Sequence, residues 1–272
     1  MIDDTTPALF VADEQGRYHP TRYAVGPWDP RLLHGGATGG LVAHALEVAD
    51  PVPALQFVRL SIDLLRPVPL APLTAEARVV RSGTRLCVME AELRHEDRIV
   101  VKAQALKLMP DPVTAPEHAR PDRPLPADPD TIPVTDLMGR ALPELAQRRP
   151  SMHHCIEAKR VRGFALRGEG TAWLRCAVPV VHGRALSPFA RVAALADFGN
   201  GLAQLQVDSL TGCINADISL HLLRPPSAEW ICLEARAELF DHGLGAVHAT
   251  LFDPAGYIGR VTQTLLTRRM GR

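Results

Sequence analysis

The sequence predicts an α+β fold made of two tandem copies of one domain, each an antiparallel sheet wrapped around a central helix. Three observations support this prediction. The chain contains a long-range internal repeat, each half has a helical segment that is poor in charged side chains, and runs of alternating apolar and polar residues follow each of these segments.

The repeat is clearest where the segments 60–69 and 218–227 read LSIDLLRPVP and ISLHLLRPPS. Arg66 aligns with Arg224, an offset of 224 − 66 = 158 residues. The same offset aligns two copies of Glu-Ala-Arg, the first of which begins at Glu76. An offset this long indicates two copies of a domain and excludes a solenoid of short repeats.

One helix is predicted in each half, over 35–49 and over 187–203. Ser187 is a typical N-cap residue, and Pro188 suits the first helical position. A solvent-exposed helix carries charged side chains along one face, whereas these segments carry very few. Both helices are therefore expected to be enclosed by a sheet.

The strand predictions rest on period-two alternation and on turn residues between the runs. Over 214–223, Ile218 and Leu220 fall on one face, while Asn215 and Asp217 fall on the other. The pattern leaves open whether a helix or a second subunit covers the apolar faces. The expected strands are 55–65, 73–82, 86–94 and 98–108 in the first half, and 157–163, 172–178, 214–223, 230–240, 244–252 and 257–268 in the second.

The segment 110–133 has a proline every two to five residues, so it is predicted to be an extended linker. A short amphipathic helix is expected over 134–147. The predicted organisation is therefore a first domain over 1–109, a linker with a short helix over 110–150, and a second domain over 151–272.

The composition argues against several classes of protein. Thirty basic residues balance thirty acidic ones, so no partner held by bulk charge, such as nucleic acid or a membrane surface, is expected. The five cysteines are odd in number and contain no CxxC pair, which predicts reduced thiols in a cytoplasmic protein without a metal site. Neither a signal peptide nor a membrane-spanning segment is expected.

Three motifs together resemble the acyl-CoA thioesterase II family, the TesB-like double hotdog thioesterases. They are LHGGATGGLVAHAL at the first helix, LADFGNG followed by NADISLHLLRPPSAEW, and GYIGRVTQTLLTRR near the end. The resemblance covers nearly the whole chain apart from the linker. It implies hydrolysis of acyl-CoA thioesters, as in lipid metabolism, by an activated water without a covalent intermediate or a cofactor. It also implies a homo-oligomer, a dimer or larger.

The resemblance implies three catalytic positions, which fall on Asp197, Asn215 and Gln263. Asp197 and Gln263 match the family's pattern, whereas Asn215 stands where the family has Thr or Ser. An amide can still bind a water because it both donates and accepts hydrogen bonds. Gln104 is taken as the counterpart of Gln263 in the first half.

The residues themselves also suggest this chemistry. Small neighbours in the helix leave the carboxylate of Asp197 accessible as a general base. Asp217 is kept as an alternative base. Candidate substrate-binding residues are grouped at the start of the first helix and after Asp197: His34, Gly35, Gly36, Asn200 and Gly201. Backbone N–H groups near Gly35 and Gly36 are candidates to polarise the thioester carbonyl.

Two other functions remain open at this point. Asp29 and His34 have the Asp-x4-His spacing of a MaoC-type enoyl-CoA hydratase, although the usual Asn-Pro between them is missing. A non-catalytic acyl-CoA-binding module is the second alternative, if Asn215 has abolished turnover. Arg66 and Arg224 are expected to be structural, with a CoA phosphate as an alternative partner for one of them. The acyl chain length is not predicted.

Overall fold

The computed structural model describes residues 7–137, 151–163, 165–208 and 211–269 of the 272-residue chain. In the first half, helix α1 spans Gly35–Val48. The strands of this half are β1 (Phe10–Ala12), β2 (Arg17–Pro20), β3 (Gln56–Leu64), β4 (Leu73–Ser82), β5 (Leu86–His95) and β6 (Arg98–Leu108).

Among the described residues of the second half, two α-helices take the place of the single one predicted, α3 (Pro188–Ala196) and α4 (Phe198–Leu202). Its strands are β7 (Thr135–Asp136), β8 (Ile156–Gly163), β9 (Glu169–Cys176), β10 (Thr211–Asn215), β11 (Asp217–Leu222), β12 (Ile231–Leu239), β13 (Leu244–Asp253) and β14 (Gly256–Arg269). Most predicted strands are confirmed to within one or two residues.

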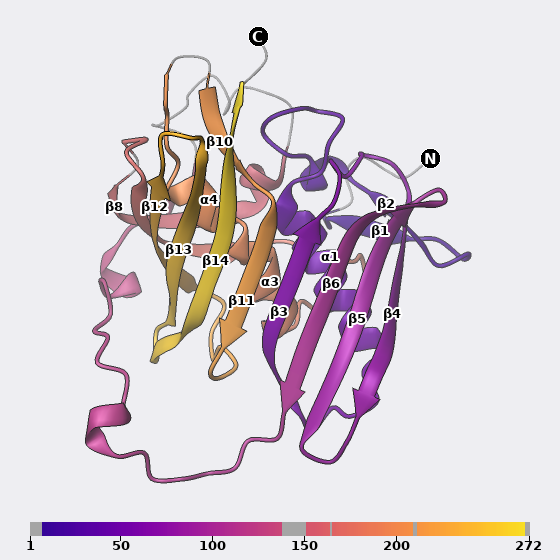
Figure 1. Ribbon diagram of the computed structural model, residues 1–272, viewed down its shortest axis with the longest axis horizontal. Coiled ribbons are helices and arrows are strands. Elements are labelled where there is room, and N and C mark those ends of the chain that lie inside the picture. The colour runs from indigo at the N-terminus through magenta and orange to yellow at the C-terminus, as the bar shows by residue number, and fades with distance from the viewer. Residues whose placement is uncertain (1–6, 138–150, 164, 209–210, 270–272) are drawn as a thin grey trace.

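The described strands form one 14-stranded sheet in the order β1-β2-β4-β5-β6-β3-β11-β14-β13-β12-β9-β8-β7, and β10 pairs with β14. Neighbouring strands are antiparallel, as predicted. The helices pack on one side of this sheet (Figure 1). A large antiparallel sheet with few helices is the arrangement of a hotdog fold. No helix in the described ranges is long and apolar enough to cross a membrane.

Several strands of the second half recur at the offset of 158 residues from strands of the first. Strands β5 and β13 are separated by the same 158 residues as Arg66 and Arg224 over their full length. At the centre of the sheet β3 pairs with β11, and Ser61 lies opposite Ser219, its own counterpart at this offset. A local twofold axis therefore passes between these two serines.

The apolar faces of β3 and β11 are covered within the chain. Leu60 and Ile62 on β3, and Ile218 and Leu220 on β11, are each about 1% exposed and belong to the central core. The question that the period-two pattern left open is thus answered: the helices cover these faces, and no second subunit is needed for that purpose.

Helices α1 and α3 approach so closely that α1 needs glycine at the contact. A Cβ atom on Gly36 would lie 2.3 Å from the carbonyl oxygen of Ala194. A Cβ atom on Gly39 would lie 2.8 Å from the carbonyl oxygen of Ala193. Glycine at these two positions of α1 therefore allows the backbones of α1 and α3 to pack against each other.

The N-terminal strands were not predicted, because each has only three or four residues and little alternation. They connect the two halves: the N–H of Phe10 donates to the carbonyl of Val180 at 2.8 Å. Most of the segment 110–133 lacks regular structure. The helix predicted over 134–147 lies largely outside the described residues, and its first part contains β7 instead.

Arg224 has the structural role that was expected of it. Its guanidinium binds both carboxylate oxygens of Asp253, at 2.7 and 2.5 Å, and the carbonyl of Gly256 at 3.0 Å. The carboxylate of Asp253 is fully buried and also accepts two hydrogen bonds from Ser227. Burial acts to raise the pKa of Asp253, but Arg224 and Ser227 outweigh it and lower the pKa to about 2.

We expect Gly39→Ala to lower the free energy of unfolding by about 1–3 kcal/mol, because the new methyl group must displace the backbone of α3. Gly201→Ala is the matched control, since a Cβ atom there meets nothing within 4 Å. Its expected effect lies between zero and a gain of about 1 kcal/mol, from helix propensity. Urea denaturation measures both. Equal losses in the two variants would contradict the close-packing argument.

Asp253→Asn is expected to lower the free energy of unfolding by about 1–2 kcal/mol at neutral pH, allowing for solvent screening at Arg224. The pKa of Asp253 is lower in the folded protein than in the unfolded chain. The extra free energy of unfolding of the wild type is therefore fully present at a pH above the unfolded-state pKa of this carboxyl group. That advantage is lost as the pH falls toward about 2. Urea denaturation from pH 7 down to pH 3 should show the difference between the two proteins become smaller. Asp241→Asn, in an exposed turn, is the control. If the difference in free energy of unfolding between wild type and Asp253→Asn did not change with pH, the stabilising role assigned to the ionised Asp253 would be wrong.

Candidate active site

Asp197 lies at the junction between the two helices of the second half, not inside one helix as predicted. It is the C-cap of α3 and immediately precedes α4. The residue is only 9% exposed. The break turns its carboxylate toward the first turn of α1, which the close packing of α1 and α3 has brought alongside.

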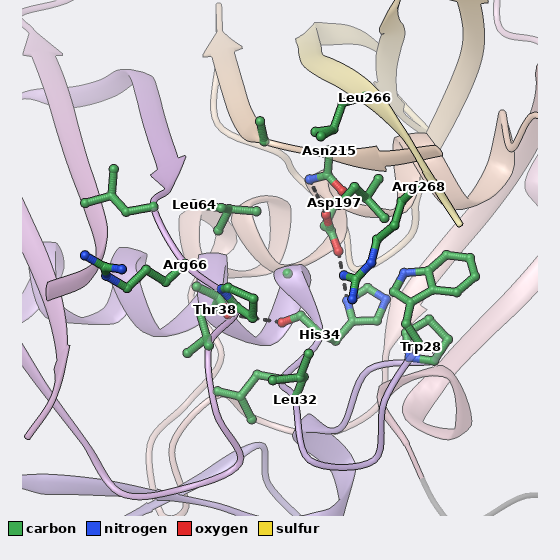
Figure 2. A pocket seen from close by; sticks show the side chains of 18 residues that line it. Trp28, Leu32, His34, Thr38, Leu64, Arg66, Asp197, Asn215, Leu266 and Arg268 are labelled. Carbon is green, nitrogen blue, oxygen red and sulfur yellow. Dashed lines mark hydrogen bonds and ion pairs between the residues drawn. The ribbon is translucent and has the colours of Figure 1, made fainter. Parts of the chain in front are cut away.

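Four groups surround this carboxylate (Figure 2 shows His34, Asn215 and Asp197). Its Oδ2 atom accepts the backbone N–H of Gly36 at 3.0 Å and lies 3.0 Å from Nδ1 of His34. Its Oδ1 atom accepts a hydrogen bond from Nδ2 of Asn215 at 3.0 Å and a longer one from Nε2 of Gln263 at 3.4 Å. The three positions implied by the resemblance therefore meet in space, together with His34.

Asn215 reaches this site because the strand is interrupted at Ala216. Asn215 pairs with Leu265, whereas Ser219 pairs with Thr262, so the register shifts by one residue between β10 and β11. A one-residue shift reverses the side chains to the opposite face of the sheet. The prediction that Asn215 and Asp217 share a face was therefore wrong.

The amide of Gln263 is held in a fixed orientation. Its Oε1 accepts the backbone N–H of Asn200 at 2.9 Å, so its Nε2 is turned toward Asp197. Gly199 makes room for it, since a Cβ atom there would lie 2.8 Å from Oε1. Gln104 is not its counterpart: Gln104 pairs with Ser61 as Thr262 pairs with Ser219, and its side chain binds Arg59.

His34 caps α1 and contacts Asp197, a pairing that the sequence did not predict. The N–H of Gly36 lies within hydrogen-bonding distance of both Nδ1 of His34 (2.9 Å) and Oδ2 of Asp197. Two bare acceptors 3.0 Å apart would repel each other, so a proton must lie between Nδ1 and the carboxylate. We therefore assign the Nδ1–H tautomer to His34, with the N–H of Gly36 directed to Asp197.

Two further buried rings support His34. Its imidazole stacks on Phe198 at 4.6 Å between centroids and meets the edge of His153 at 4.9 Å. Burial, with a smaller contribution from His34, lowers the pKa of His153 to about 3, so His153 is neutral at physiological pH. Sequence reasoning placed His153 in a loop and missed this contact, because nothing local links it to His34.

The environment of Asp197 favours its ionised form. Burial acts to raise the pKa of Asp197. The charge of His34 when protonated, and hydrogen bonds from His34, Asn215 and Gly36, outweigh burial and lower the pKa below its ordinary value. The carboxylate also lies at the positive end of the dipole of α1. It is therefore a stable anion at neutral pH.

A pocket of about 270 Å³ opens over this carboxylate. Most of its wall is apolar, and His34 and Asn215 lie beside Asp197, whereas Arg66 lies apart from them (Figure 2). This combination suits a ligand with an apolar part and one reacting polar group. The lining residues are Pro27, Trp28, Leu32, Leu33, His34, Gly35, Thr38, Leu64, Leu65, Arg66, Pro67, Val68, Asp197, Ile214, Asn215, Ala216, Leu266 and Arg268.

Not every predicted substrate-binding residue lines this pocket. Gly35 does, and its Cα lies against Asp197, since a Cβ there would fall 2.6 Å from the carboxylate. The N–H of Gly36 is occupied by Asp197 rather than left for a substrate carbonyl. Asn200 is buried behind Gln263, and Gly201 is exposed away from the pocket.

The alternative acids have other partners. Asp217 accepts the backbone N–H of Thr264 and the hydroxyl of Ser219, and it does not line the pocket. Asp29 binds the backbone N–H and guanidinium of Arg31, so the predicted Asp29–His34 pair is not formed. Within the described ranges, no three His, Cys, Asp or Glu side chains are grouped so that they could hold a metal ion.

Comparison with protein-family models gives two matches in sequence order. Residues 24–108 match the acyl-CoA thioesterase N-terminal domain, and residues 116–267 match the acyl-CoA thioesterase C-terminal domain. The second match alone spans more than half of the chain. Comparison with curated protein sequences gave no match.

Solved structures share the fold at low sequence identity. A protein with a hotdog fold from Alicyclobacillus acidocaldarius has a TM-score of 0.68 at 16% identity, covering 97% of each chain. The acyl-CoA thioesterase II TesB2 of Mycobacterium marinum has a TM-score of 0.61 at 18% identity, covering 86% of this chain and 90% of that one.

A tesB protein of Mycobacterium avium subspecies paratuberculosis gives 0.62 at 14% identity, covering 93% of this chain and 92% of the other. At these identities the structures establish the hotdog fold, and the family models establish the membership. The chain belongs to the acyl-CoA thioesterase family and is a thioester hydrolase.

Proposed function

We propose that this enzyme hydrolyses acyl-CoA thioesters with a water molecule activated by Asp197, without a covalent intermediate. The observation that carries the proposal is the position of Asp197: a buried, ionised carboxylate at the floor of the largely apolar pocket, held by donors from both halves of the chain. A general base needs to be ionised and within reach of a water beside the substrate.

In the proposed reaction, water transfers one proton to Asp197 while the water oxygen bonds to the thioester carbonyl carbon. The carbon–sulfur bond then breaks, and its electron pair leaves with sulfur. The proton held by Asp197 passes to the thiolate, which leaves a free acid and a free thiol. A carboxylate is a weak base, but a thiol has a pKa of about 8.5 and is a good leaving group, so a weak base is adequate.

The neighbours of Asp197 have distinct proposed roles. Asn215 lines the pocket and donates to Oδ1, and its amide oxygen has capacity to accept a hydrogen from the attacking water. Gln263 holds the carboxylate from behind. Gly35 is at the start of α1, where helical N–H groups lack intrahelical partners, so its N–H is the proposed donor to the developing oxyanion.

We further propose that the chain is a double hotdog, with domains over 1–109 and 151–272 joined by the 110–150 segment, and with one reaction centre. At the offset of 158, Asn215 corresponds to Phe57 and Gln263 corresponds to Ala105. Phe57 instead stacks on Phe189 at 4.1 Å. Neither residue supplies the polar groups that surround Asp197. Assembly into a dimer or larger oligomer, and a cytoplasmic location, stay predictions.

The test follows thiol release from acetyl-, hexanoyl-, palmitoyl- and benzoyl-CoA. Asp197→Asn keeps the shape of the side chain but removes the base, so kcat should fall by roughly 10²- to 10⁴-fold. Asp217→Asn is the matched control, because Asp217 lies outside the pocket. Circular dichroism checks folding. Turnover by folded Asp197→Asn at the wild-type rate would remove Asp197 as the base, and equal losses in both variants would argue for a general structural effect.

His34→Asn is expected to raise the pKa of Asp197, because the charge and hydrogen bond of the imidazole lower it, while asparagine remains an N-cap for α1. Activity requires ionised Asp197 and is lost as the pH falls through its pKa. The acid limb of the profile of kcat/KM against pH should therefore move to higher pH in this variant. His182→Asn, an exposed histidine outside the pocket, should leave the limb in place. An unmoved limb in His34→Asn would contradict the assignment.

A further inference from the structure

The repeated arginines Arg66 and Arg224 have different surroundings. Each follows the central strand of its half by the same number of residues. Arg224 is held by the buried carboxylate of Asp253 at the end of β13. The residue at the corresponding end of β5 is His95, which contacts the carbonyl of Pro72. The first half therefore lacks the acid that fixes the arginine in the second.

Arg66 is exposed and is one of the residues that line the pocket over Asp197. Within the described ranges, no carboxylate lies within 4 Å of its guanidinium, and only its backbone N–H makes a hydrogen bond, to Val100. An arginine without an ion-pair partner has five N–H donors available for a ligand. Because Arg66 lines the pocket, the ligand nearest to it is the molecule that binds in the pocket.

Arg268, near the end of β14, is the second cation of this pocket. At the offset of 158 its counterpart is Pro110, so the first half has no equivalent cation there. The carboxylate of Asp29 is bound by Arg31, which lowers its pKa most, and the charge of Arg268 adds a smaller effect in the same direction. Figure 2 shows Arg268 and Trp28 on one side of Asp197 and Arg66 on the other.

Among the described residues that line the pocket, Asp197 is the only acid, and it lies at the floor. Arg66 and Arg268 are both exposed, and they give the opening a positive charge that the balanced composition of the chain conceals. Such a site attracts an anion at its entrance while its apolar wall accepts the uncharged part of the ligand. Guanidinium groups suit phosphate because they donate two parallel hydrogen bonds to its oxygens.

We propose that Arg66 and Arg268 bind phosphate groups of the substrate's thiol carrier. This inference rests on the proposed function, in which the thioester carbonyl lies beside Asp197. The arginines are then specificity determinants for a phosphorylated carrier and take no part in the bond changes. Substrates with the same acyl group should be distinguished by the phosphates on the leaving thiol.

The test compares hexanoyl-CoA with hexanoyl-N-acetylcysteamine, which has the same thioester but no phosphate. In Arg66→Ala and Arg268→Ala, kcat/KM for hexanoyl-CoA should fall roughly threefold to tenfold each, as for exposed ion pairs with partial screening. The value for hexanoyl-N-acetylcysteamine should stay at the wild-type level. Arg81→Ala on β4 is the matched control, since Arg81 is exposed and lies outside the pocket. Added salt should slow the wild type on the CoA substrate alone.

Calorimetric binding of free CoA and of pantetheine separates this inference from the proposed function. If Asp197→Asn remains fully active while the arginine variants bind CoA more weakly and pantetheine normally, the mechanism fails and the phosphate site stands. Equal losses on both hexanoyl substrates would overturn the inference, because the arginines would then act through the shape of the pocket. Unchanged kcat/KM and unchanged CoA affinity in both arginine variants would also overturn it.

Discussion

The close contact between α1 and α3 is the constraint on which the rest of the structure depends. The glycines of α1 allow its backbone to touch the carbonyls of Ala193 and Ala194. Three residues beyond Ala194, the chain of α3 ends at Asp197, beside the N-terminus of α1. The sheet then closes over both helices, and Gln263 reaches the carboxylate from β14. A bulkier side chain at the helix contact would separate Asp197 from the groups that keep its carboxylate charged.

The charge at Asp197 is stabilised locally and by donors from distant parts of the chain. Removing a carboxylate from water is costly unless hydrogen bonds and opposite charge replace the lost solvent. Gly36, His34 and Asn215 supply that replacement, and they come from both halves. The same donors that make the anion stable also weaken it as a base. The proposed chemistry tolerates this because the leaving group is a thiolate, which departs readily.

The regular strands could be predicted because a half-buried strand must alternate apolar and polar residues, and β3 to β6 and β11 to β14 do so. The family resemblance predicted Asp197 and Gln263 as site residues, the small neighbours of Asp197 also suggested it, and the two side chains do lie together. The inward turn of Asn215 was missed, because a register shift at Ala216 depends on how β14 pairs with it. The contact between His34 and Asp197 was missed for a similar reason, since it exists only once the two helices have packed together.

The pairing of Ser61 with Ser219 has an evolutionary consequence. In a symmetric homodimer every substitution is made twice, once in each subunit, and both sites must accept it. Here one chain supplies both sides of the twofold axis, so each copy is free to change alone. The first half has Phe57 stacked on Phe189 and a buried Lys107 paired with Asp50, whereas the second half has the polar groups around Asp197. Positions related by the offset of 158 residues can therefore differ between the two halves, as Phe57 and Asn215 do.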